Sequence, residues 1–272
     1  MMLIARAALS FAVMLAMASA CADPGAATTP FASASRQWQL PGALSEISGL
    51  AVSPDGRLFA HNDERAVIYE LDATNGRVIS SFTVGAPETG DFEGLAIAPD
   101  GTFWLTTSGG ALLRFHAGAD GARVGSESFD SGLGEVCEIE GLAIAAADLI
   151  LACKRNRGSN TMLRLFAWRP GEAARPWHEF AASEVPAAAG IDDFQPSSAE
   201  IDARSGDIWL LSAKDAAVAQ FGENGALRGA WRLGSGHIQA EGLTLLPNGA
   251  IVIADEGARG RALLSVFERD HD

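Results

Sequence analysis

A short motif built around Glu-Gly-Leu recurs along the chain, and its spacing constrains the fold more than any other feature of the sequence. Three copies are clear, at residues 92–97, 139–144 and 240–245, and two degenerate copies lie at 47–52 and 197–201. The Glu position, or the Ser in its place, falls at residues 48, 93, 140, 198 and 241. Successive copies are therefore 45, 47, 58 and 43 residues apart. A repeat of this period is typical of an array of small β-sheets, of which the β-propeller is the leading example.

Each copy opens a run of short apolar segments separated by turn residues. The copy at 92–97, for example, is followed by the turn 99–101 and by apolar segments at 103–105 and 112–115. This pattern indicates antiparallel strands joined by hairpins, and three or four such strands in about 45 residues make one propeller blade. We therefore expect an all-β chain folded as a five-bladed β-propeller, with a six-bladed ring as the alternative.

Composition divides the chain into three parts. Residues 1–20 contain Arg6 and then an apolar stretch too short to span a bilayer, which indicates a signal peptide. Residues 21–36 consist mostly of Ala, Pro, Ser and Thr and predict a flexible tether. Residues 37–269 are expected to form one propeller domain, in which residues 37–40 supply the outer strand of the last blade and close the ring.

Cys21 follows Ala18, Ser19 and Ala20 at the end of the leader. A Cys at this junction resembles the lipid-attachment site of bacterial lipoproteins, although Ala18 stands where such sites usually carry Leu. We expect a lipid at Cys21 that anchors the protein to the periplasmic face of the outer membrane, with no other membrane contact. Plain signal cleavage, which would give a soluble periplasmic or secreted protein, is the alternative.

The chain is acidic, with 20 Lys and Arg residues against 34 Asp and Glu residues and a formal net charge of −14. Nucleic-acid binding requires clustered cations, so this balance excludes a nucleic acid as the partner. The charge suits either simple solubility or the attraction of cations.

Repetition turns one carboxylate per repeat into a ring of carboxylates. In a propeller the first strand of each blade lines the channel, and the second strand returns to the same mouth. We therefore expect carboxylates from both kinds of strand end to converge there and to bind Ca²⁺, which accepts about six to eight oxygen ligands. The predicted ligands are Glu93, Glu140, Glu241, Asp63 and Asp255, with Glu46, Asp91 and Glu138 close by.

Cationic side chains offer a second way to neutralise the ring. Lys154, Arg155 and Lys214 come at the ends of second strands, so they are expected at the same mouth. In that case the ring is a buried ion network with a purely structural role. Zn²⁺ fits poorly, because the five His residues show no ligand spacing.

Catalysis has weaker support in the sequence. The chain has no Gly-x-Ser-x-Gly elbow and no recognisable set of Ser, His and Asp. His61 and His237 are expected near the channel mouth, where either could act as a base beside a metal-bound water. A packing or surface role is the simpler interpretation of both residues.

Two features leave alternatives open. Cys137 and Cys153 could form a disulfide in an exported chain, but simple hairpin pairing sets Cys153 opposite Glu140 and leaves Cys137 on the wrong side unless the chain bends. Two buried free thiols are the alternative.

Residues 169–195 show no clear period and are expected to form an insertion on one face, either a lid over the channel or a passive loop.

The ordered motifs resemble those of the SdiA-regulated family of exported or membrane-anchored bacterial proteins. The segments that show the resemblance are 46–50, 92–96, 140–142, the Ser-rich fourth copy and 239–243. The resemblance covers about residues 38–268. It implies a propeller with a link to calcium and no well-defined enzymatic reaction. The fourth copy departs from the pattern, because Ala199-Glu200 stands where Gly-Leu is usual.

From these observations we expect a calcium-linked binding or sensing module of the cell envelope. Its ligand is a metal ion, and a small ligand or another envelope protein is a further partner. The alternatives are a metal-dependent hydrolase of esters, lactones or phosphoesters, and a metal-free interaction scaffold.

Overall fold

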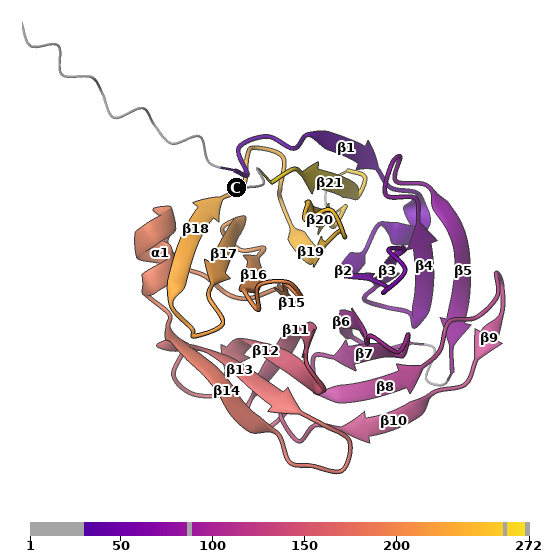
Figure 1. Cartoon of the computed structure of the whole chain (residues 1–272), viewed down its shortest axis with the longest axis horizontal. Helices are drawn as coiled ribbons and strands as arrows, with labels where there is room; N and C mark the ends of the chain where they lie inside the picture. The colour runs from indigo at the N-terminus through magenta and orange to yellow at the C-terminus, as the bar shows by residue number, and fades with distance from the viewer. Residues whose placement is uncertain (1–29, 86–88, 258–259, 270–272) are drawn as a thin grey trace, which may run out of the picture.

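Five sheets stand around a central axis, so the chain folds as a five-bladed β-propeller (Figure 1). This computed structural model describes residues 30–85, 89–257 and 260–269. The expected signal peptide and Cys21 lie outside the described residues. Within the described part of the chain, no helix has the length and apolar character needed to cross a membrane.

The blades follow one another in sequence, and the first strand of each lies innermost (Figure 1). Blade 1 consists of β2 (Ile47–Val52), β3 (Leu58–Asn62), β4 (Val67–Leu71) and β5 (Val78–Val84), extended at its rim by β9 (Arg123–Val124). Blade 2 consists of β6 (Phe92–Ile97), β7 (Phe103–Thr107), β8 (Ala111–Phe115) and β10 (Glu127–Asp130). Blade 3 consists of β11 (Cys137–Ala145), β12 (Asp148–Asn156), β13 (Met162–Trp168) and β14 (Arg175–Ala181). Blade 4 consists of β15 (Ser198–Ile201), β16 (Ile208–Ser212), β17 (Ala217–Phe221) and β18 (Leu227–Arg232).

Blade 5 combines strands from both ends of the chain. Its inner strands are β19 (Ala240–Leu245), β20 (Ile251–Asp255) and β21 (Leu263–Phe267). Its outer strand is β1 (Arg36–Gln39), which pairs antiparallel with β21 and places Trp38 opposite Leu264. This is the closure that the sequence predicts. A short 3-10 helix, Gly42–Leu44, then leads from β1 toward blade 1.

Packing extends into the segment expected to be a tether. Phe31 is buried between blades 4 and 5, where its ring lies 5.7 Å from that of Trp231 and 5.2 Å from that of Phe267. Its carbonyl also accepts a hydrogen bond from the backbone N–H of Gly234. The packed part of the chain therefore begins before residue 37.

Most of residues 169–195 belongs to the rim of the ring and not to an insertion over one face. β14 is the outer strand of blade 3 and pairs with β13. The helix α1 (Glu184–Ala189) follows it and packs against β18 at the outer edge of blade 4 (Figure 1). The sequence conceals β14, because Arg-Pro-Trp-His-Glu-Phe-Ala lacks the apolar run that marks the other strands.

The hydrophobic core is divided among the junctions between blades. One cluster of buried side chains fills each of the five junctions around the ring. Between blades 1 and 2, for example, Phe59 and Phe103 pack edge to face with their ring centres 5.0 Å apart. Burial on both faces of every blade fixes the inner strands in relation to one another.

The motif glycines lie where inner strands of neighbouring blades approach one another. A Cβ atom on Gly94 would lie 2.6 Å from Cβ of Leu142 and 2.8 Å from its backbone nitrogen, in the next blade. A Cβ atom on Gly141 would lie 2.8 Å from the backbone nitrogen of Ala199. Only glycine allows this close approach of two backbones.

The same neighbour relation shifts the alignment of the fourth copy by one residue. Because Ala199 is the neighbour of Gly141, it stands at the position of the motif Leu. Ser197 therefore takes the position of the motif Glu, which the spacing alone assigns to Ser198. Glu200 falls at the next position along β15, where it lines the channel.

Candidate functional site

The motif Glu is the extra residue of a β-bulge. In blade 2, Phe92 pairs with Thr107 and Gly94 pairs with Thr106, so Glu93 has no partner in the ladder. A bulge bends its strand and redirects the side chain of the extra residue. The same register shift leaves the motif residue unpaired in three other blades: Ser48, Glu140 and Glu241.

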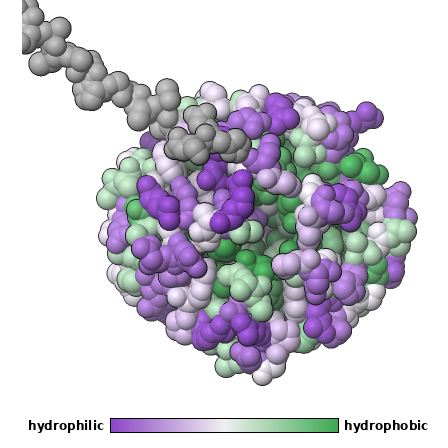
Figure 2. All heavy atoms as spheres, in the orientation of Figure 1, coloured by the Kyte–Doolittle hydropathy of each residue, from purple (hydrophilic) through white to green (hydrophobic). Residues whose placement is uncertain are grey.

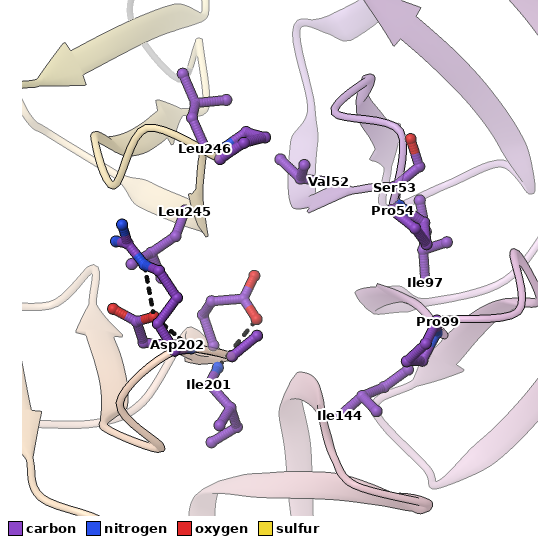
Figure 3. A pocket seen from close by; sticks show the side chains of 14 residues that line it. Val52, Ser53, Pro54, Ile97, Pro99, Ile144, Ile201, Asp202, Leu245 and Leu246 are labelled. Carbon is purple, nitrogen blue, oxygen red and sulfur yellow. Dashed lines mark hydrogen bonds and ion pairs between the residues drawn. The ribbon is translucent and has the colours of Figure 1, made fainter.

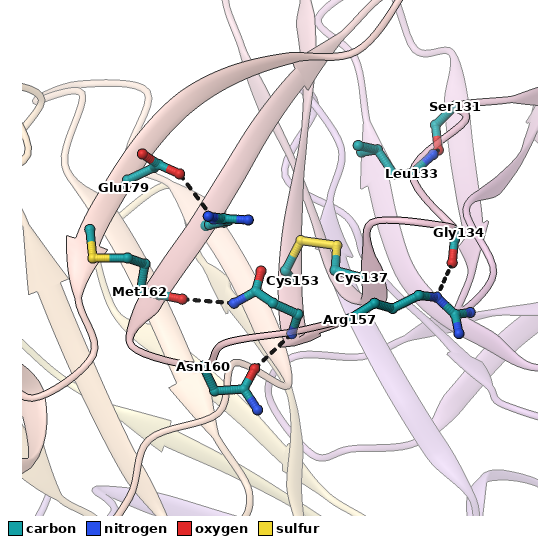
Figure 4. Close-up of a disulfide and its surroundings, with 11 residues drawn as sticks. Ser131, Leu133, Gly134, Cys137, Cys153, Arg157, Asn160, Met162 and Glu179 are labelled. Carbon is teal, nitrogen blue, oxygen red and sulfur yellow. Dashed lines mark hydrogen bonds and ion pairs between the residues drawn. A yellow bond between two sulfur atoms is a disulfide. The ribbon is translucent and has the colours of Figure 1, made fainter.

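A further shift in blade 3 brings two cysteines together. Ile139, and not Glu140, lies opposite Cys153, and the register shifts again between Glu138 and Ile139. The structure joins Cys137 to Cys153 in a disulfide, with Cα atoms 5.7 Å apart (Figure 4). The expected pairing of Cys153 with Glu140 is wrong, because the bulge supplies the bend that simple hairpin pairing lacks.

Glu140 and Lys154 form the centre of the site. The Lys154 ammonium lies 3.0 Å from Glu140 Oε1, and the Glu140 side chain is only 4% exposed. Burial raises the pKa of Glu140 to about 7 even though Lys154 acts to lower it. We call this end of the channel, defined by Glu93, Glu140, Lys154 and Glu241, the carboxylate mouth.

Glu93 lies beside this pair and is half-buried. Its Oε2 accepts a hydrogen bond of 3.1 Å from the hydroxyl of Ser48 in blade 1. Burial, followed by the charges of Glu140 and Asp91, raises the pKa of Glu93 to about 9. Ser48, which stands in place of Glu in the first motif copy, thus donates a hydrogen bond to Glu93 of the second copy.

Glu241 completes the group from blade 5. Its Oε2 is buried and has no hydrogen-bond partner among the described residues. Burial and the charge of Glu140 raise the pKa of Glu241 to about 7, whereas Lys154 acts to lower it. Burial would lower the pKa of Lys154, but Glu140 and Glu241 outweigh that effect and raise it above its ordinary value. One ammonium therefore serves several carboxyl groups.

Asp255 is engaged with a histidine. Its Oδ2 lies 2.7 Å from Nδ1 of His237, and the two side chains are 3% and 4% exposed. Its other oxygen, Oδ1, has no hydrogen-bond partner in the described part of the chain. His237, a candidate base, is thus enclosed against Asp255 and the ring of Phe267.

Asp63 belongs to a second group of carboxyls beside Glu241. Burial, followed by the charge of Glu46, raises the pKa of Asp63. Glu256, which was not among the predicted ligands, has its pKa raised to about 7 by burial and by Glu46. Its position directly after Asp255, at the end of a second strand, was the signal that could have found it.

Two of the three predicted cations do not join the carboxylate mouth. Lys214 pairs with Asp193 at 2.5 Å, and its side chain is 51% exposed. Arg155 is exposed and donates a hydrogen bond of 3.2 Å to Gln195 Oε1. Within the described residues, only Lys154 among the predicted cations therefore neutralises the motif carboxyls.

His61 lies in the packed interior of blade 1. It is fully buried, and a Cβ atom on Gly49 would lie 2.4 Å from its Nε2. Burial lowers its pKa to about 4, so the ring is neutral at physiological pH. Its packing against the motif glycine gives it a structural position, closed to a substrate.

The described residues contain no group of three His, Cys, Asp or Glu side chains already arranged to hold a metal ion. The carboxylate mouth nevertheless has the donor chemistry of a hard-cation site. In this mouth, Glu241 keeps one buried oxygen without a hydrogen-bond partner among these residues. Asp63, in the neighbouring group, and Asp255, beside His237, each keep another. Such oxygens suit Ca²⁺ or Mg²⁺ and not the N and S ligands of Zn²⁺.

The SdiA-regulated family model matches residues 27–259 of the chain. The chain belongs to the SdiA-regulated family. The match takes in all the motif copies that form the inner strands, including the fourth, divergent one. Among curated proteins, no sequence matches the chain.

Several solved structures have a similar fold. Glutaminyl cyclase from Myxococcus xanthus superposes with a TM-score of 0.55 and 15% identity, over 86% of this chain and 97% of that one. The PQQ-bound aldose sugar dehydrogenase from Streptomyces coelicolor has a TM-score of 0.52 and 16% identity, over 86% and 97% of the two chains. A luciferin-regenerating enzyme has a TM-score of 0.53 and 12% identity, over 86% and 95%. At these identities the likeness concerns the fold alone.

Proposed function

We propose that the carboxylate mouth binds Ca²⁺ and that the protein is a calcium-linked binding or sensing module of the cell envelope. The observation that carries the proposal is the excess of carboxyl groups over cations. Among the described residues, Glu93, Glu140 and Glu241 share the one ammonium of Lys154. Crowded, partly buried carboxylates need protons or cations, and a divalent cation can replace the protons.

Each residue of the carboxylate mouth has a distinct part in this proposal. Glu93 and Glu241 hold the ion, while Glu140 stays paired with Lys154. Ser48 keeps Glu93 oriented through its hydrogen bond. Because both ligands sit on β-bulges, their side chains can turn toward a common point without a change in the blades. The bound ion supplies a fixed positive charge that can take up oxygen atoms of a further ligand.

Binding is better supported than hydrolysis. Of the two candidate bases, His237 is enclosed against Asp255 and His61 is buried within blade 1. Neither is open to a substrate at the channel mouth. A metal-free scaffold remains the second candidate, and the ion pair between Glu140 and Lys154 favours it.

Thermal melting with and without Ca²⁺ distinguishes these two functions. An ion that binds only the folded protein stabilises it by about 2.7 kcal/mol at 100 times its dissociation constant. We expect a gain of this order for the wild type, and its loss in Glu241→Gln. Glu223→Gln, which changes an exposed carboxylate on blade 4, is the matched control and should keep the gain. If the melting temperature of the wild type does not change with Ca²⁺, the metal-free scaffold is favoured.

The proposed location in the cell envelope is inferred from the sequence of residues 1–21. We propose that Cys21 carries a lipid that holds the propeller at a membrane. Cys21→Ser should then move the protein from the membrane fraction to the soluble fraction, because residues 22–36 offer little apolar surface. A wild type already soluble after export contradicts the anchor and leaves plain secretion.

A further inference from the structure

The opposite end of the channel carries a cavity of a different character. Its volume is about 390 Å³, and most of its walls are apolar. A ring of aliphatic side chains comes from the ends of the inner strands: the last residues of β2, β6, β15 and β19 and the last but one of β11. The ring consists of Val52, Ile97, Ile144, Ile201 and Leu245. Figure 2 shows a central hollow bordered by hydrophobic residues, and Figure 3 shows these side chains around the cavity. We call this end the apolar mouth.

Two carboxyl groups line this cavity, and they differ in their partners. Asp202 pairs with Arg204, which also lines the cavity, whereas Glu200 has no cationic partner among the described residues. Glu200 of β15 lines both the cavity and the adjoining part of the channel. The corresponding positions of the other blades carry Ala or Thr: Ala51, Ala96, Ala143 and Thr244. Among these five equivalent positions of the inner strands, only that of blade 4 is therefore acidic. Asp202 and Arg204, which also line the cavity, follow the end of β15 and pair with each other.

The carboxyl of Glu200 is held in a fixed orientation. Its Oε2 accepts a hydrogen bond of 2.7 Å from the hydroxyl of Thr244, and its Oε1 accepts one of 3.0 Å from the N–H of Ile201. Each oxygen thus keeps acceptor capacity that these two bonds do not use.

No cation in the described part of the chain pairs with Glu200. The nearby guanidinium groups of Arg204 and Arg269 are paired instead with Asp202, at 3.5 and 3.2 Å. A carboxylate in apolar surroundings is costly unless it is protonated or paired with a positive charge. The described residues supply no such charge to Glu200, so its ionised form has room for a positive charge on a bound molecule.

We propose that the apolar mouth binds a small molecule that has an apolar body and a protonated amine, with the amine donating hydrogen bonds to Glu200. The ring of aliphatic side chains takes the apolar body, and the volume of the cavity matches small-molecule sites, which span roughly 300–1,000 Å³. The amine supplies the positive charge that no described residue brings to Glu200. This site is separate from the carboxylate mouth and does not depend on calcium.

The raised pKa of the Glu200 carboxyl predicts that amine binding depends on pH. Burial, which hydrogen bonds from Thr244 and Ile201 only partly offset, raises the pKa of Glu200 to about 7. The charge of Asp202 acts in the same direction. The ionised form that pairs with an amine therefore becomes the major form only above neutral pH.

Calorimetric titration of the purified protein with hexylamine and with hexanol tests the proposal. The two probes share an apolar body and differ in charge. At pH 8 we expect hexylamine to bind at least about tenfold more tightly than hexanol, since hydrogen bonds to charged groups are the stronger ones. Between pH 8 and pH 5.5 this preference should fall roughly thirtyfold if it follows the ionised fraction of a group with a pKa near 7.

Variants then locate the amine. Glu200→Gln keeps the shape of the side chain, so hexanol should still bind while the preference for hexylamine and its pH dependence disappear. Glu241→Gln, at the other mouth, should leave hexylamine binding unchanged, as should Glu223→Gln on the surface. Equal binding of the two probes by the wild type overturns the proposal, as does the absence of binding by either. Loss of the preference in Glu241→Gln alone places the amine at the carboxylate mouth and also overturns it.

Discussion

At the scale of single residues, the carboxylate mouth is governed by one ammonium. Lys154 contacts Glu140 directly at 3.0 Å and also lowers the pKa of Glu93 and Glu241 through its charge. The sequence identified the three Glu residues and Lys154 from their positions in the repeat. It did not show that Lys154 joins the motif carboxyls and Lys214 does not, because the partner of each lysine depends on neighbours from another part of the chain.

Replacing Lys154 tests this assignment. Lys154→Met leaves Glu140 without its partner, and loss of one member of a largely buried ion pair should destabilise the fold by about 2 kcal/mol or more at pH 8. Lys214→Met is the matched control, because its pair with Asp193 is half-exposed and should contribute less than about 1 kcal/mol. Urea denaturation measures both values. Equal, small losses in the two variants contradict the central position of Lys154.

At the scale of strands, the inner strand of each blade combines a bulge with a glycine. The period of the motif predicted these strands, because apolar runs and turns recur with it. The bulges at Ser48, Glu93, Glu140 and Glu241 could not be predicted, because a register shift leaves no mark in the apolar pattern. The fourth copy was misaligned by one residue for a related reason: two adjacent serines fit the motif equally well, and only the contact with the next blade decides between them.

The close approach of inner strands predicts a strong dependence on the motif glycine. Gly94→Ala places a methyl group against Leu142 of the next blade, and this overpacking should destabilise the fold by about 2 kcal/mol. Gly158→Ala is the control, because no atom lies within 4 Å of the added Cβ, and its effect should stay within about 0.5 kcal/mol. Denaturation curves of the two variants provide the comparison. A Gly94→Ala protein as stable as the control is evidence against the packing described here.

The disulfide makes a prediction at the same scale. Cys137 and Cys153 are 16 residues apart, and closing a loop of that size stabilises a protein by about 3 kcal/mol through the unfolded chain. We expect the double variant Cys137→Ser with Cys153→Ser to lose stability of this order relative to the oxidised wild type. Thiol titration of the unfolded, non-reduced protein checks the pairing independently. Reactive thiols from both residues would show that the bond does not form.

At the scale of the whole molecule, the two ends of the channel have opposite characters. One mouth gathers Glu93, Glu140 and Glu241 around Lys154. The other is lined mostly by apolar side chains, with Glu200 and the paired Asp202 and Arg204 among them. The repeat explains both, because equivalent positions of the inner strands lie at the same height in the ring. The sequence predicted the ring and its carboxylate mouth. It did not predict the apolar mouth, because the position of Glu200 in the channel depends on the corrected alignment.

The raised pKa values predict how stability depends on pH. Glu140, Glu200 and Glu241 have pKa values raised to about 7 and Glu93 to about 9, above the ordinary value of 4.5. The folded protein therefore retains protons that the unfolded chain has lost, and stability falls as pH rises toward these values. His61 has the opposite effect, because burial lowers its pKa from 6.5 to about 4. Through this residue the folded protein loses stability as the pH falls from 6.5 toward 4.

Above pH 6.5 only the carboxyl effect remains. Without added Ca²⁺, the melting temperature should decline from pH 6.5 to pH 9, and the decline should be smaller in Glu93→Gln, which cannot ionise. Scanning calorimetry across this interval measures the trend. A melting temperature that rises with pH over the same interval contradicts the buried, protonated state of the carboxyls.

Calorimetric titration of the metal-free protein with Ca²⁺ at pH 8 shows whether the carboxylate mouth binds the ion. We expect one ion to bind per chain in the wild type and in Glu223→Gln. We expect no measurable binding in Glu93→Gln or Glu241→Gln, although both variants remain folded. Binding should also release protons, which repeated titrations in buffers of different ionisation enthalpy detect, because the ion displaces protons from the carboxyl groups. If the wild type takes up no Ca²⁺, the carboxylate mouth is not a calcium site and is an ion network around Lys154.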